Sequence, residues 1–166
     1  MRIRSFIITA TVAVALPLQA AEQAVAIPIQ RLTMETALKA AQATIAQCRK
    51  EGVQIAVTVV DRSGDPQVVL RDVLAPELTL TISRQKAYTA VSFNAATSSM
   101  EDRFTKPFSV GKVEGLVFSA GAVPVTAGGT LYGAIGVSGA PSGATDEKCA
   151  RAGVEAIAAD LELGSM

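Results

Sequence analysis

The chain has 166 residues, among them 15 basic and 15 acidic side chains, and it contains neither histidine nor tryptophan. The balanced charge indicates neither nucleic acid nor a membrane surface as a partner, and the length suits a single domain. Without histidine, the commonest general base and transition-metal ligand are missing, which excludes the usual Ser-His and Cys-His catalytic pairs.

The first 21 residues have the pattern of a secretory signal peptide. Arg2 and Arg4 precede an apolar run at residues 6–16, and Ala20 and Ala21 provide small residues for cleavage. This run is well short of the roughly 20 residues that a membrane-spanning helix needs. We therefore expect a signal peptide at residues 1–21, a mature domain at residues 22–166 and a periplasmic or secreted protein.

The first half of the mature chain predicts a helix followed by a hairpin. Thr33 is placed to cap the helix, after which residues 54–61 form a β-branched run typical of a buried strand. Pro66–Arg71 predicts the second strand of the hairpin, with proline at its start. The helix is indicated by residues that recur every three or four positions: Met34, Ala37, Leu38, Ala41, Ile45 and Cys48.

The second half contains an ambiguous segment, a long loop and a second hairpin. Residues 76–94 are ambiguous because a strand-like alternation runs into helix-favouring residues. Residues 95–112 predict either a packed surface loop with a short helix or a mobile lid, and the packed loop is favoured. Residues 120–126 and Thr130–Ser138 flank a glycine turn and predict a hairpin.

The last helix completes the order of elements. Thr145 is expected to cap it, with Asp146 and Glu147 near its positive N-terminal end. Consecutive antiparallel strands with helices around them predict a single-domain α+β fold, which differs from the doubly wound folds that bind nucleotides.

A glycine-rich stretch lies in the second hairpin and just after it. Gly133, Gly136 and Gly139 follow neither the dinucleotide nor the P-loop spacing. The favoured interpretation is that these glycines let a helix or another subunit approach the sheet closely. A second interpretation is an amide-rich concavity from Ser138 to Thr145, at a helix N-terminus, that holds a carboxylate or another anion.

Cys48 and Cys149 are the only cysteines of the chain. In an exported protein, an even pair favours a disulfide, which here would join the first and last helices across a loop of roughly 100 residues. The alternative is a pair of buried free thiols.

Several polar residues are candidates for a ligand pocket. Lys86, Tyr88 and Thr89 lie on one segment, and Arg71 ends the second strand. These side chains either converge on a pocket or line a solvated helix face. The chain has no G-x-S-x-G elbow and no metal-ligand constellation, so we identify no catalytic residue.

Four motifs carry a family resemblance by their order and spacing. They are RQKAYTA at residues 84–90, GAVP at 121–124, GAIGVSG at 133–139 and DEKCARAG at 146–153. Together they resemble the GlcG/HbpS family of haem-binding proteins, which is related to the C-terminal module of PduO-type corrinoid adenosyltransferases. The resemblance covers nearly all of the mature chain.

This resemblance implies a profilin-like fold, an antiparallel sheet of about five strands flanked by helices. It favours a helix for residues 76–94, and it implies homo-oligomers from dimers to octamers. The family usually has a glycine shortly after the arginine that ends the second strand. Here the chain runs from Arg71 to Pro76 without glycine, which alters a loop that would border a ligand.

The resemblance also implies haem as the cofactor. A histidine-ligated site, as in the adenosyltransferase module, is excluded because the chain has no histidine. Lys86 and Arg71 are the expected partners of propionate groups, and Ser138 and Thr145 are possible anion contacts. Tyrosine and methionine are established haem ligands. The candidate iron ligands are a reduced cysteine, Thr89, Tyr88, Met100 and Tyr132.

Three functions follow as hypotheses. The leading one is an exported, homo-oligomeric protein that binds haem or a related small molecule without catalysing a reaction, with a role in haem or redox sensing. The second is an accessory protein or small-molecule enzyme of a periplasmic oxidation pathway. The third is a structural assembly module that has no ligand.

Overall fold

The computed structural model describes residues 25–104, 106 and 110–164, and the predicted signal peptide lies outside these residues. In this part of the chain, no helix has the length and apolar character that crossing a membrane requires. The elements are α1 (Met34–Lys50), β1 (Ala56–Asp61), β2 (Pro66–Arg71), α2 (Leu78–Phe93), η1 (Thr97–Met100), η2 (Val110–Lys112), β3 (Ala122–Ala127), β4 (Thr130–Ser138) and α3 (Gly143–Gly164).

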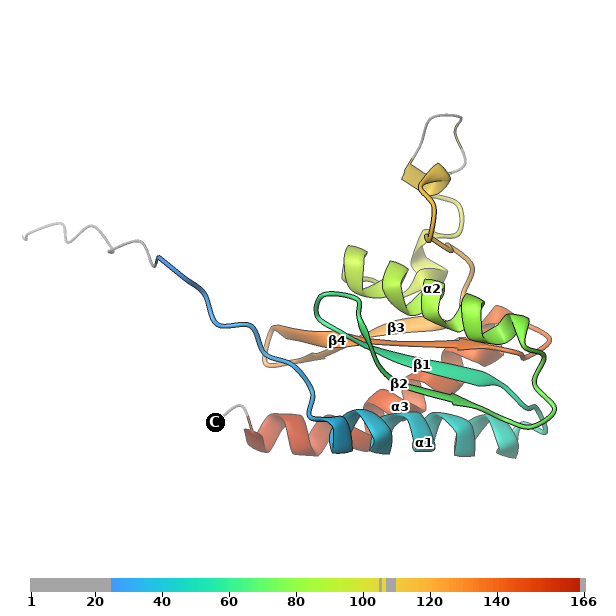
Figure 1. Ribbon diagram of the computed structural model, residues 1–166, viewed down its shortest axis with the longest axis horizontal. Helices are drawn as coiled ribbons and strands as arrows, with labels where there is room; N and C mark the ends of the chain where they lie inside the picture. Colours follow the sequence, from blue (N-terminus) through green and yellow to red (C-terminus); the bar gives the residue numbers. More distant parts are fainter. Residues whose placement is uncertain (1–24, 105, 107–109, 165–166) are drawn as a thin grey trace, which may run out of the picture.

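The strands form one antiparallel sheet in the order β2-β1-β4-β3. Helices α1 and α3 lie together under one face of the sheet, and α2 covers the other (Figure 1). The predicted single-domain α+β fold is confirmed. Within the described residues, the sheet has four strands, whereas the resemblance implied about five.

The centre of the sheet is buried on both faces. All six residues of β1 are buried, as its β-branched run predicts, because β1 lies between β2 and β4 with helices on both sides. Val57 and Val59 belong to the apolar cluster beneath α1 and α3, whereas Val60 belongs to the cluster beneath α2.

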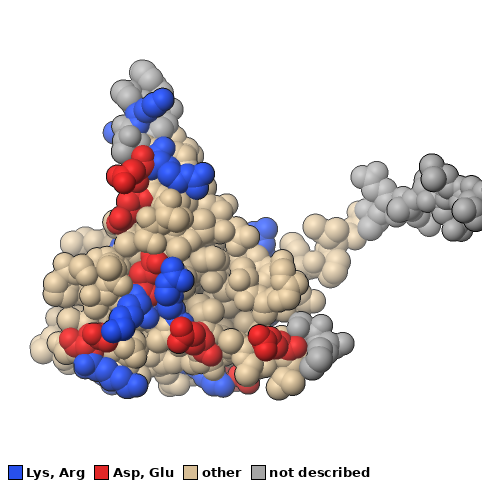
Figure 2. All heavy atoms as spheres, turned by 180° about the vertical axis from the view of Figure 1, so that it is seen from behind, with Lys and Arg blue, Asp and Glu red and all other residues tan. Residues whose placement is uncertain are grey.

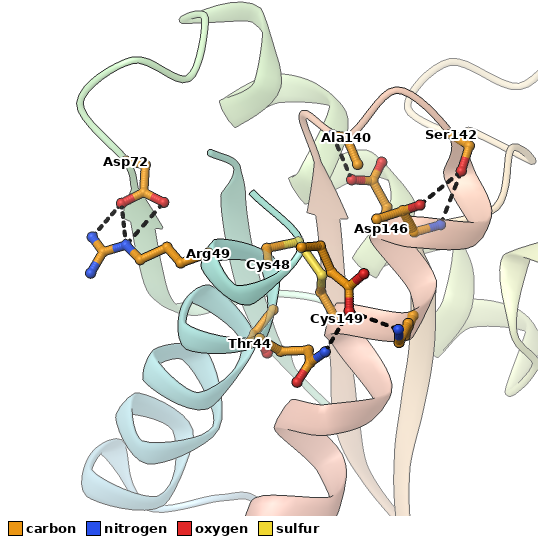
Figure 3. The surroundings of a disulfide bond; sticks show 12 residues. Thr44, Cys48, Arg49, Asp72, Ala140, Ser142, Asp146 and Cys149 are labelled. Atoms are coloured by element: carbon orange, nitrogen blue, oxygen red, sulfur yellow. Dashed lines mark hydrogen bonds and ion pairs between the residues drawn. A yellow bond between two sulfur atoms is a disulfide. The ribbon is translucent and has the colours of Figure 1, made fainter. Parts of the chain in front are cut away.

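Helices α1 and α3 approach closely because small residues meet at their contact. A Cβ atom added at Gly153 of α3 would lie 2.8 Å from the carbonyl oxygen of Ala40 in α1. The predicted cap of α1 is confirmed, since the N–H of Thr36 donates to the side chain of Thr33. The predicted disulfide between Cys48 and Cys149 is also confirmed and joins the two helices (Figure 3).

Helix α2 lies directly against the backbone of β4. A Cβ atom added at Gly136 would lie 2.1 Å from the carbonyl oxygen of Ser83 and 2.5 Å from the amide nitrogen of Ala87. The favoured interpretation of the glycine stretch, close approach of a helix, is therefore confirmed at Gly136. The helix implied for residues 76–94 is confirmed too, and it ends at Asn94 in the left-handed conformation, with φ of 46°.

The cap predicted for the last helix is wrong by three residues. Helix α3 begins at Gly143, and the N–H of Thr145 donates to the hydroxyl of Ser142 at 3.2 Å. Ser142 therefore caps the first turn, and Thr145 lies inside the helix. The two hydroxyl groups are also 3.0 Å apart, so the pair forms a local network at this end.

The connection between α2 and β3 projects from the sheet beyond α2 (Figure 1). Thr97 and Met100 of η1 are fully buried, whereas no residue of η2 is buried. The rings of Phe93, Phe104 and Phe118 contact one another, with centroids 4.7 to 5.4 Å apart. The predicted packed loop is thus confirmed for η1 and for this aromatic cluster.

Reduction of the disulfide is expected to lower the free energy of unfolding by up to about 4–5 kcal/mol, because the bond closes a long loop in the unfolded chain. The sequence separation of the two cysteines is 101 residues. Chemical denaturation with and without a reductant measures the difference. A Cys48→Ala/Cys149→Ala variant is the control and should not respond to the reductant. Equal stability of the oxidised and reduced wild-type protein would contradict the prediction.

Gly136→Ala is expected to destabilise the protein by about 1–3 kcal/mol, because the new methyl group forces α2 away from β4. Gly164→Ala is the matched control, since a Cβ atom there meets nothing within 4 Å. Thermal unfolding followed by circular dichroism measures both variants. An unchanged midpoint for Gly136→Ala would show that the close contact between α2 and β4 does not exist.

Candidate functional site

The side chain of Lys86 points from α2 into the protein. Its ammonium group lies 3.0 Å from a carboxylate oxygen of Asp146 in α3, and the two side chains are 5% and 4% exposed. Gly121 provides the room for this pair, because a Cβ atom there would lie 2.5 Å from the Lys86 nitrogen. Lys86 therefore links α2 to α3 across the end of the sheet.

The carboxylate of Asp146 has a second partner in the turn before α3. The N–H of Ala140 donates to it at 3.0 Å (Figure 3). Burial raises the pKa of Asp146, and the hydrogen bond from Ala140 and the charge of Lys86 offset this effect in part. The concavity predicted for an external anion at residues 138–145 thus already receives a carboxylate of the protein itself.

Two predicted iron ligands, Thr89 and Met100, are fully buried. The hydroxyl of Thr89 donates to the carbonyl of Gln85 at 2.8 Å and accepts the N–H of Val117 at 2.9 Å. Thr89 therefore attaches the connection between α2 and β3 to α2. The ligand roles of Thr89 and Met100 stay predictions, and neither side chain presents a surface to solvent.

Two other predicted residues lie near the end of the sheet that Lys86 occupies. Arg71 and Ser138 both pair with Ala56, so they lie on either side of β1 at that end. The guanidinium of Arg71 donates to the carbonyl of Ala75, and Ser138 is buried. Arg71 borders a hollow of about 320 Å³ beside α1.

Tyr88 is the predicted residue that faces outward. Its side chain is 42% exposed on α2, and its ring lies against the backbone of Gly64, where a Cβ atom would come within 2.6 Å. Tyr88 borders two hollows, of about 330 and 840 Å³. The structure therefore separates Tyr88 from Lys86 and Arg71, which the sequence analysis had considered together.

The smaller hollow combines a stripe of α2 with the connection to β3. Its lining residues are Thr81, Arg84, Gln85, Tyr88, Glu114 and Gly115. The four residues from α2 are spaced three, one and three positions apart, so they share one face of the helix. Sequence analysis missed Thr81, Arg84 and Gln85, although this helical spacing from Tyr88 would have indicated them.

The larger hollow lies between the N-terminal segment and the last turns of α2. It is lined in part by Ile27, Ile29, Val91, Phe93 and Leu131, which give it apolar walls, and by Arg62. We call the surface formed by the two hollows and Tyr88 the α2 outer surface. It offers a phenol oxygen, guanidinium groups on both sides and apolar side chains.

Another hollow, of about 550 Å³, lies beside the first turns of α3. Its buried Glu147 accepts hydrogen bonds from the backbone and hydroxyl of Ser98 and from Arg151, so its carboxylate is already paired. Basic and acidic side chains mix over the helical layer (Figure 2). Within the described ranges, no group of three or more acidic, cysteine or histidine residues is arranged to hold a metal ion.

Comparison with known protein families assigns the chain to one of them. A family model described as "Haem degrading protein HbpS-like" matches residues 32–155. The chain belongs to the HbpS-like family. This confirms the resemblance found in the motifs. An uncharacterized 15.0 kDa protein from Citrobacter freundii is 31% identical over 116 residues, which cover 67% of this chain and 82% of that protein.

Several solved structures have the same fold. A double mutant of HbpS from Streptomyces reticuli is 40% identical, with a TM-score of 0.75, and the match covers 86% of this chain and 97% of HbpS. A second HbpS structure is 41% identical, with the same TM-score and coverage of 82% and 96%. The complex of PduOC with haem is 24% identical, with a TM-score of 0.69 and coverage of 76% and 95%, and shows the fold alone.

Lys86→Met is expected to destabilise the protein by about 3–5 kcal/mol, because it leaves the buried carboxylate of Asp146 without its counter-charge. Lys86→Met/Asp146→Asn should be more stable than the single variant, since no buried charge remains and the amide oxygen still accepts from Ala140. Urea denaturation of the variants measures the difference.

The free energy of unfolding of Lys86→Met is expected to be lower than that of the double variant, and this deficit should shrink as the pH falls. Burial raises the pKa of Asp146 in the folded protein above its ordinary value of 3.8, so protonation favours the folded state. The deficit is therefore largest above the folded pKa and is lost toward pH 3.8. A deficit that does not depend on pH would contradict this account.

Proposed function

We propose that this protein binds haem or a related tetrapyrrole on the α2 outer surface, with Tyr88 as the iron ligand. Membership of a family described as haem degrading, and the likeness to HbpS at 40–41% identity, support a tetrapyrrole as the ligand. The fold is shared with PduOC, which was solved in complex with haem. We choose this surface because Tyr88 is exposed there between two hollows.

The residues around Tyr88 fit a haem group. A phenol oxygen is an established haem ligand, and Tyr88 is half-exposed between two hollows. Arg84 in the smaller hollow and Arg62 in the larger one provide guanidinium groups for propionates. Ile27 and Phe93 provide apolar surface for the macrocycle. Bound haem would supply redox-active iron, while these side chains hold and orient it.

The buried residues that were predicted to contact haem fit a haem site less well than Tyr88 does. Lys86 is paired with Asp146, and the hydroxyl of Thr89 has both a donor and an acceptor partner inside the protein. Met100 has no exposed surface. Each would have to leave a packed position before it reached a ligand, whereas Tyr88 needs no such change.

We also propose that the protein is exported. The signal peptide predicted at residues 1–21 would deliver a mature domain of residues 22–166 to the periplasm or the outside of the cell. The bond between Cys48 and Cys149 supports this location, because structural disulfides persist in oxidising compartments. A haem protein in such a compartment would be suited to haem or redox sensing.

Haem degradation is a second candidate, favoured by the description of the family model. Spectroscopy separates it from binding alone. With a reductant and oxygen present, a binding protein keeps its Soret band, whereas a degrading protein loses the band progressively. An accessory protein of a periplasmic oxidation pathway and an assembly module without ligand would both show no saturable binding of haem.

Tyr88→Phe is expected to weaken hemin binding by about tenfold and to abolish the resonance Raman signature of iron-bound phenolate, since the variant lacks the oxygen ligand. Tyr132→Phe is the matched control. It changes the other tyrosine of the chain, which is buried in the core cluster beneath α1 and α3. Titration of the oxidised mature protein, followed at the Soret band, measures both affinities.

The outcomes test separately whether the protein binds haem and where it binds it. Absence of any saturable spectral change in the wild-type protein at micromolar hemin would reject haem binding itself. Binding that is unchanged by Tyr88→Phe but lost in Tyr132→Phe would place the iron elsewhere. Arg84→Ala provides a further check, because it should weaken the binding of hemin more than that of a porphyrin whose propionates are esterified.

A further inference from the structure

Two arginine side chains on the α2 outer surface have no partner within the part of the chain that the structure describes. They are Arg62 and Arg84, and both are exposed. The other described arginines each make a hydrogen bond, an ion pair or a cation–π contact: Arg31, Arg49, Arg71, Arg103 and Arg151. The two unpaired charges are therefore available to a ligand.

The unpaired guanidinium groups lie in different hollows, and Tyr88 borders both. Arg84 precedes Tyr88 by four residues, so it lies about one turn toward the N-terminus on the same face of α2 and lines the smaller hollow. Arg62 belongs to the turn between β1 and β2 and lines the larger hollow. The ring of Tyr88 lies against Gly64 of that turn. The exposed phenol is thus accompanied by one positive charge in each of the two hollows.

The other charged groups near the two hollows leave Arg62 without a competitor. Among the described residues that line the larger hollow, Arg62 alone is charged. Asp61, its neighbour in the sequence, is buried and forms an ion pair with Arg31 at 3.2 Å. The smaller hollow also has Glu114 in its lining, which offsets the charge of Arg84 in part. The larger hollow therefore attracts a carboxylate even though many of its walls are apolar.

A tetrapyrrole that uses both guanidinium groups needs carboxylates on opposite edges. Protohaem has its two propionates on one edge of the macrocycle and its vinyl groups on the opposite edge. When its propionates occupy one hollow, the guanidinium group of the other hollow keeps no partner. A porphyrin with propionates in place of the vinyl groups offers each edge a carboxylate, which pairs bidentately with arginine.

We infer that the α2 outer surface is selective for a tetrapyrrole with carboxylates on two opposite edges, which Arg84 and Arg62 bind. This inference rests on the proposed function, since it also uses Tyr88 and its two hollows, and it adds the chemical class of the preferred ligand. Ile27 and Phe93 offer apolar surface to the macrocycle, and Arg62 gives the same hollow a place for carboxylates.

Titration of the oxidised, full mature chain with three iron porphyrins tests the inference. Iron coproporphyrin III has propionates on both edges, whereas hemin has them on one. Iron mesoporphyrin, with ethyl groups in place of the vinyls of hemin, is the control for the loss of the vinyl groups. We expect iron coproporphyrin III to bind about tenfold more tightly than either of the others, because it gains a charge-assisted pair with Arg62. The Soret band reports the three dissociation constants.

Arg62→Ala is expected to remove this preference. It should weaken the binding of iron coproporphyrin III about tenfold more than that of hemin, since the second carboxylate edge loses its partner. Lys50→Ala is the matched control for the loss of one positive charge, because Lys50 ends α1 on the other face of the sheet. This control should keep the preference. Circular dichroism checks that each variant is folded.

The outcomes distinguish this inference from the haem proposal. Equal affinities of the wild-type protein for iron coproporphyrin III and hemin would overturn the inference and leave the haem proposal intact, whether or not any variant folds. A preference that persists in folded Arg62→Ala, or that is lost equally in Lys50→Ala, would also overturn it. Absence of saturable binding of all three porphyrins would reject both.

Discussion

The architecture depends on the absence of side chains at two positions of β4. A Cβ atom at Gly133 or at Gly136 would lie 2.1 Å from a carbonyl oxygen, that of Val60 in β1 or of Ser83 in α2. Backbone atoms therefore occupy the space where other residues would project side chains. This close approach lets α2 cover β1, β4 and β3 as one layer, and it sets which face of α2 is buried.

The position of α2 in turn decides which of its groups are available for chemistry. On its inner face, Lys86 bonds to Asp146, and Thr89 bonds to the connection before β3. These polar groups therefore have their partners within the protein. The opposite face carries Arg84 and Tyr88, which border the hollows. The same helix thus provides a structural side and a side for ligands, and the proposed site is a consequence of the packing beneath it.

Both faces of the sheet are also held by links between distant parts of the chain. The disulfide joins α1 to α3 on one side, and the buried ion pair joins α2 to α3 at the end of the sheet. Helix α3 takes part in both links, so it is joined to α1 on its own face of the sheet and to α2 on the other.

Local patterns in the sequence were sufficient for most of the fold. Periodicity identified α1, the β-branched run identified β1, and the cysteines and motifs gave the disulfide and the family. The predicted cap of α3 was wrong, and the implied count of about five strands differs slightly from the four observed. The connection from α2 to β3 is organised by tertiary contacts of Thr97 and Met100, and several hydroxyl residues near α3 were equivalent candidates for its cap.

The candidate site was only half predictable for a geometric reason. The sequence by itself determined the spacing of Lys86 and Tyr88, and residues two apart on a helix point about 200° away from each other, a consequence that the sequence analysis did not use when it grouped them. It did not determine which face is buried. Only the tertiary structure decided that, because the contact between Gly136 and α2 turns Lys86 toward Asp146 and leaves Tyr88 at the surface.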